Sequence, residues 1–293
     1  MFGRSSSRID LPSMPATLAR ILQITNSPDA SAERVASIVM LDQSLTTKVL
    51  RLANSAYFGR RRPAETITEA ITILGFSAVR NLAASASVVD ALFPRQMFPG
   101  FGWQEMWIHS VTCAVGAEVI CDCSRNVSVR SSETAFVAGL LHDVGKLILA
   151  RTLPARFRQI VEDCQKLNCQ MVDAEKTLLS TDHAEVGGEL AKQWEFPEKL
   201  GASIAYHHVP QDAYDHEDLA RVVSAANFLA KRMSRTYLSG VSQEISLKDV
   251  AEAAHIPVES MDMVVDRVRD RMRQCSEILA WGNQMPGAKE MAA

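Results

Sequence analysis

The chain lacks the features that mark several large classes of protein. No run of apolar residues is of the length that a bilayer-spanning helix needs, so we expect no membrane span. Residues 1–10 are polar and contain no apolar stretch of the kind found in secretion signals, which favours a cytoplasmic location. The six cysteines include no C-x-x-C pair, so we expect reduced thiols that pack in the core rather than disulfides.

The chain also has little net charge. The formal charge is −3 over 293 residues, which predicts no broad basic surface for nucleic acid or anionic lipid. The one basic run, Arg60 to Arg62, precedes Pro63, and we interpret it as a solvated loop, with a phosphate contact as the lesser alternative. We therefore expect neither a nucleic-acid partner nor a membrane partner.

What the chain does contain is helical periodicity almost throughout, with no convincing alternating strand. Ser31 is a predicted N-cap, and capping boxes are predicted at Thr66 and at Ser246. Long helices are predicted over residues 77–92 and 103–123, and the second is apolar on most faces and therefore central. These patterns predict an all-α protein of a dozen or so helices.

Histidines fall at notable places along these predicted helices. Neutral imidazole is a common metal ligand, and burying several unpaired imidazoles is costly, so a cluster of them points to a metal. Histidine nitrogens with a carboxylate suit Fe, Mn, Zn or Ni, and do not select among these ions. The predicted ligands of a divalent metal are His109, His142, Asp143, His183, His207 and His208.

The His142–Asp143 pair has apolar flanks, which predicts that it lies within a buried helix. Adjacent helical residues point about 100° apart, so both can reach one ion only if the ion sits close over the helix. Gly139 and Gly145 would allow such an approach. Lys146 lies four residues after His142, on the same face, where a cation could contact a phosphate oxygen.

This ordered set of histidines resembles the HD superfamily of metal-dependent phosphohydrolases, and HD-GYP cyclic-di-GMP phosphodiesterases in particular. The rest of the chain resembles the HDOD group, the HD-related output domains. This resemblance implies a two-lobed all-α bundle with an HD-like core, and a signalling role without proven catalysis. The segments that carry it are Leu11–Pro15, Leu52–Gly59, Ala70–Gly75, Ala138–Asp143 and Trp194–Pro197.

The resemblance also suggests how the chain divides. We predict an N-terminal helical lobe over residues 1–100, an HD-like core with the histidine-rich pocket over residues 101–235, and a C-terminal helical extension over residues 236–293. The extension is the least diagnostic of the three parts.

The chain departs from the HD-GYP pattern at two points. No G-Y-P motif follows His207 and His208, and Asn227 stands where the last aspartate of the HD superfamily is expected. An amide is neutral and is a weaker ligand for a hard cation, so hydrolysis by a two-metal site should suffer most. One ion bound by the remaining ligands is still compatible with this sequence.

Two interpretations of function follow. The favoured one is a bacterial signalling module that acts through protein partners in trans, with histidines that hold a structural metal or are vestigial. The alternative is a metal-dependent phosphohydrolase acting on a nucleotide or cyclic dinucleotide, in which Asp143 binds metal and Lys146 contacts phosphate. We lean against an enzyme and assign no catalytic or cofactor-binding residue. The partner, the upstream signal and the oligomeric state are not predicted.

Overall fold

A computed structural model describes residues 9–25, 31–54, 63–75, 102–124, 132–234 and 245–275, isolated positions between 79 and 92, and residues 279–280. All regular elements within these ranges are helices, which confirms the all-α prediction. The Arg60–Arg62 run and most of the predicted helix over residues 77–92 lie outside the described residues. So do the predicted boundaries at residues 100 and 235, and the division into three parts stays a prediction.

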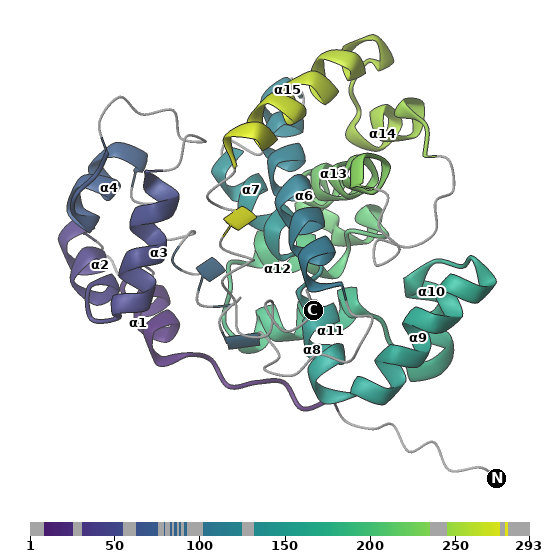
Figure 1. The fold of residues 1–293 in the computed structure, drawn as a ribbon, viewed down its shortest axis with the longest axis horizontal. Coiled ribbons are helices and arrows are strands. Elements are labelled where there is room, and N and C mark those ends of the chain that lie inside the picture. The colour runs from purple at the N-terminus through teal and green to yellow at the C-terminus, as the bar shows by residue number, and fades with distance from the viewer. Residues whose placement is uncertain are drawn as a thin grey trace.

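The first four helices, all within the predicted N-terminal lobe, lie together at one side of the molecule (Figure 1). Ser31 caps the second of them by accepting a hydrogen bond from the Arg34 amide at 3.3 Å, and Thr66 opens the fourth with a capping box, as predicted. At the end of the third helix, the side chain of Asn54 bonds both backbone groups of Ala64, at 2.6 and 2.8 Å. The helices are α1 (Ala16–Thr25), α2 (Ala32–Val39), α3 (Gln43–Ala53) and α4 (Ile67–Leu74).

The core is built around α6, which has the predicted bounds Trp103–Cys123. This helix packs against α7 (Ser132–Leu141) and α13 (Glu217–Ser234) over much of its length. On the other side of α7, α8 (Val144–Thr152) packs against α11 (His183–Gln193), which in turn packs against α12 (Glu198–Ala205). A short 3-10 segment, η2 (Pro210–His216), leads into α13.

Helix α6 corrects one expectation from the sequence. Among the described residues it is the one helix that is long and apolar enough to cross a membrane. However, 78% of its apolar window is buried by neighbouring helices, which is typical of a central helix of a folded core. The prediction that no apolar run is long enough to span a bilayer is therefore wrong for α6. The apolar residues of this helix pack in the core.

Two helical pairs flank the core (Figure 1). The first is α9 (Pro154–Leu167) with α10 (Met171–Leu179), and the second is α14 (Leu247–Ala254) with α15 (Met261–Gln274), joined by η4 (Val258–Ser260). Helix α15 packs on α6, and α14 packs on α13. At the other end of the chain, the side chains of Gln193 and Trp194 donate to the Pro12 carbonyl at 3.2 and 3.0 Å, which fastens the N-terminal segment to the core.

Candidate metal centre

The His142–Asp143 pair lies in a break between two helices. Helix α7 ends at Leu141 and α8 begins at Val144, so the prediction that the pair sits inside one continuous helix is wrong. In a straight helix the two side chains would diverge by about 100°. The turn at Asp143, with φ −94° and ψ 12°, removes this constraint and lets both side chains face the same interior.

The two glycines on either side of the break bring helices together. A Cβ at Gly139 would lie 2.7 Å from the carbonyl oxygen of Cys113 on α6, and a Cβ at Gly145 would overlap the carbonyl of His183 on α11. Real Cβ atoms do not approach backbone so closely, and only glycine fits at either position. The glycines thus bring α6 and α11, with their histidines, up to the His142–Asp143 turn.

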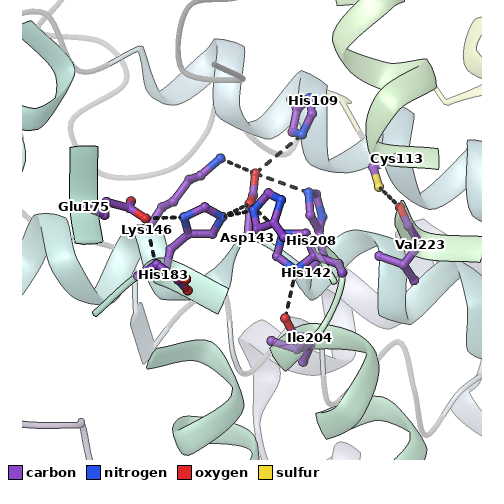
Figure 2. A network of polar contacts seen from close by, with 12 residues as sticks. His109, Cys113, His142, Asp143, Lys146, Glu175, His183, Ile204, His208 and Val223 are labelled. Atoms are coloured by element: carbon purple, nitrogen blue, oxygen red, sulfur yellow. Dashed lines mark hydrogen bonds and ion pairs between the residues drawn. The ribbon is translucent and has the colours of Figure 1, made fainter. Parts of the chain in front are cut away.

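All six predicted ligands converge in the structure. Asp143 lies at their centre, with one oxygen facing each of two groups of histidines (Figure 2). Its Oδ2 atom is 3.5 Å from Nε2 of His109 and 3.3 Å from Nε2 of His142. Its Oδ1 atom is 3.2 Å from Nε2 of His183 and 3.8 Å from Nε2 of His207. Nε2 of His208 completes the second group, 3.0 Å from that of His183.

The outer nitrogens of three imidazoles are held by the protein. Nδ1 of His142 lies 2.7 Å from the Gly139 carbonyl, and Nδ1 of His207 lies 2.8 Å from the Ile204 carbonyl. Nδ1 of His183 lies 2.5 Å from a carboxylate oxygen of Glu175. If each Nδ1 donates its proton outward, the Nε2 lone pair faces the centre, as in protein metal sites.

The inner atoms fit a metal ion. Nε2 of His109, Nε2 of His142, Nε2 of His207 and Oδ1 of Asp143 are buried and have no hydrogen-bond partner. Buried polar atoms without hydrogen-bond partners are rare, and several that converge are typical of residues that bind a ligand. Four imidazoles, one more that is half-buried, and a carboxylate suit Fe, Mn, Zn or Ni.

The charges around the centre oppose the effect of burial. Burial raises the pKa of Asp143, but His142 and Lys146 together hold that pKa well below its usual range. Burial lowers the pKa of His142, but Asp143 and Cys113 together outweigh burial and raise that pKa to about 10. For His109 and His207 burial prevails and the pKa falls well below its usual value, so these imidazoles are neutral, the form that binds metal.

Two charged residues behave differently from what the sequence suggested. Lys146 is buried and donates from Nζ to Oδ2 of Asp143 at 2.7 Å, so it holds the central carboxylate directly. Glu175 on α10 was not predicted, yet it is fully buried and bonds both the ring and the amide of His183. A signal existed, because Glu175 falls on the apolar stripe that Met171 and Ala174 form along α10.

Comparison with known proteins decides the family. The HDOD domain family matches residues 11–210, which is more than half of the chain. The chain belongs to the HDOD family. The HDOD match includes all six candidate ligands, and it ends just after His208.

Solved structures with the same fold agree with this assignment. An HDOD domain protein of unknown function from Geobacter sulfurreducens is 27% identical, with a TM-score of 0.72, and the match covers 94% of this chain and 93% of that one. A candidate phosphohydrolase from Shewanella amazonensis SB2B is 25% identical, with a TM-score of 0.72 and 94% of each chain covered. A candidate signal transduction protein from Marinobacter aquaeolei VT8, 23% identical with a TM-score of 0.75, shares the fold over 97% of this HDOD chain and 61% of its own.

A curated relative extends further than this chain. An uncharacterized protein of Treponema pallidum (strain Nichols) is 24% identical over 219 residues. The match covers 74% of this HDOD chain and 42% of that protein, so this chain spans less than half the length of its curated relative.

Proposed function

We propose that this HDOD chain is a cytoplasmic signalling module that holds a divalent metal in its core and acts through protein partners in trans rather than through turnover. The observation that supports the metal is the convergence of six candidate ligand side chains, with Asp143 at their centre, and five of the six are buried. A tightly bound ion stabilises the fold by mass action, and occupancy can thereby change what the module presents to a partner.

The argument against turnover rests on Asn227. It lies on α13 with its side chain 2% exposed, and its Oδ1 atom has no hydrogen-bond partner. Two divalent ions close together need several carboxylates to offset their repulsion, and here Asp143 is the one carboxylate among the six candidate ligands. We therefore favour a single ion, bound by Asp143 together with histidines of the six candidate ligands.

One observation favours a second candidate, a metal-dependent phosphohydrolase. The two oxygens of Asp143 face separate histidine groups, as a carboxylate shared by two ions would. When bound in such a pair, the ions supply an activated water and stabilise the leaving oxygen. Lys146 would then keep Asp143 ionised and oriented between the two groups.

Incubation of the metal-loaded protein with cyclic-di-GMP and a panel of nucleoside phosphates separates these functions. The proposal predicts a metal-dependent rise in melting temperature and no release of product above that of His142→Ala. Turnover that is present in the wild type and absent from both His142→Ala and Asp143→Ala would establish the phosphohydrolase instead.

A further inference from the structure

Cys164 and Cys169 form a pair of thiols outside the metal centre. Cys164 lies in the last turn but one of α9, and Cys169 lies in the short connection between α9 and α10. Their sulfur atoms are 3.9 Å apart. Both thiols are free, and neither residue belongs to the six candidate ligands. The proposed function therefore leaves this pair without a role.

The two thiols differ in their access to solvent. Cys164 is 6% exposed, whereas Cys169 is only partly buried. Burial raises the pKa of Cys164 to about 12, so this thiol keeps its proton at neutral pH. An oxidant that arrives from solvent therefore meets Cys169 first, with Cys164 behind it as a second thiol.

The backbone between the two cysteines leaves Cys169 outside regular structure. Helix α9 ends at Leu167, and Asn168 follows in the left-handed conformation, with φ 54° and ψ 42°. The side-chain torsion of Cys169 is therefore not restricted by a preceding helical turn. A disulfide has a sulfur–sulfur distance of about 2.05 Å, so the two sulfurs must approach by about 1.9 Å to bond.

The pair lies at a junction that leads to the metal centre. Helix α10 begins at Met171, two residues after Cys169, and packs on α9. One turn further along α10, Glu175 bonds both the ring and the amide of His183. A covalent link between the two cysteines would thus fix the start of the helix that holds a candidate metal ligand in place.

We propose that Cys164 and Cys169 are a site of reversible oxidation, at which a peroxide converts the two thiols to an intramolecular disulfide. This proposal goes beyond the proposed function and does not require bound metal. Disulfides of cytoplasmic proteins are usually transient and redox-sensing, which agrees with a reversible site.

The oxidation takes place in two steps. The Cys169 sulfur attacks one oxygen of hydrogen peroxide, the O–O bond breaks, and the second oxygen leaves as water with the thiol proton, so that Cys169 becomes a sulfenic acid. The Cys164 sulfur then attacks the Cys169 sulfur, the S–O bond breaks, and the hydroxyl leaves as a second water with the Cys164 proton. The two thiols lose two electrons in total, and the peroxide gains them.

Peptide mapping of the full chain before and after treatment with hydrogen peroxide tests the proposal. Remaining thiols are blocked with iodoacetamide, and trypsin then cuts after Lys166, between the two cysteines. The proposal predicts that peptides Gln159–Lys166 and Leu167–Lys176 become linked, with a mass two hydrogens below the sum of the two. Dithiothreitol should restore both free peptides.

Cys164→Ser and Cys169→Ser should each abolish the link. Because Cys169 is partly exposed, its variant keeps the test valid if the buried Cys164→Ser does not fold. Cys123→Ser is the matched control, since Cys123 is also partly buried but its sulfur contacts the guanidinium of Arg267 at 3.4 Å. This variant should form the link as wild type does.

Three results would overturn the proposal: iodoacetamide on both cysteines after peroxide treatment, a sulfinic acid at Cys169 in place of the link, or a link to a second copy of the chain. None of them bears on the metal, because metal-free protein gives the same test. Failure of this inference is therefore distinct from failure of the proposed function.

Discussion

The predicted N-terminal lobe and the predicted core are both helical in their described residues, yet they bury different side chains. Among the described residues of the lobe, Ser85 is the one buried polar side chain, and the rest of the interior is hydrocarbon. The core instead buries four imidazoles, two acidic groups of the centre and Lys146. Burial of apolar side chains is enough to hold helices together. Burying the charged and imidazole groups of the core costs desolvation free energy, which indicates a ligand that offsets this cost.

The largest effect is expected from removing the Asp143 carboxylate, which faces both groups of histidines. Asp143→Asn should lose almost all bound metal, and the apoprotein should also lose about 3–5 kcal/mol of unfolding free energy, because the buried Lys146 loses the carboxylate charge that offsets its own. Elemental analysis and urea unfolding measure the two effects. Asp266→Asn, at an exposed position on α15, is the matched control and should change neither. Unchanged metal content in Asp143→Asn would remove Asp143 from the site.

A cavity in the lobe should affect stability alone. Leu45 is 2% exposed in the apolar interior, so Leu45→Ala should cost about 2–5 kcal/mol of unfolding free energy. The metal content of the folded protein should stay at the wild-type value. A parallel loss of metal would show that the two regions are coupled and that the comparison is too simple.

Glu175 tests whether the metal centre also depends on a buried residue that does not bind the ion. Its carboxylate contacts the ring of His183, and we expect it to hold that ring in position. Glu175→Gln keeps an acceptor for the His183 ring but removes the charge, and such outer-shell changes weaken metal binding about 10–100-fold. Competition with a chelator measures the affinity. Glu175→Ala should weaken binding further, whereas Glu162→Gln, exposed on α9, should have no effect. Equal affinities in Glu175→Gln and wild type would contradict a positioning role.

The smallest expected effect concerns Glu118, on α6 away from the centre. Burial raises its pKa to about 7 from an unfolded value near 4.5, so the folded state favours the protonated carboxyl. The resulting stability is fully present below about pH 4.5 and is lost as pH rises through 7. Glu118→Gln should therefore be more stable than wild type at pH 8, by about 1 kcal/mol, and equal to it near pH 4.5. The same difference in melting temperature at both pH values would exclude this cause.

Local signals predicted much of the fold. The bounds of α6, the Ser31 cap and the capping boxes at Thr66 and Ser246 depend on residues within one or two turns, and all agree with the structure. The six candidate ligands could be chosen because imidazoles on apolar helices are conspicuous.

Tertiary features could not be predicted in the same way. The break at His142–Asp143 has the same apolar flanks as a continuous helix, and its cause is the approach of α11 to Gly145. Glu175 lies on α10 and His183 on α11, so the contact between them depends on how the folded chain brings two helices together. These contacts join residues that are distant in sequence or lie on different helices.

The metal content of untagged protein, purified without added metal and after reloading with Mn, Fe or Zn, tests the central claim most directly. The account predicts about one divalent ion per chain in wild type, a rise in melting temperature on loading, and the loss of both in Asp143→Asn. Less than about a tenth of an ion per chain, with no thermal shift from any of the three metals, would contradict it.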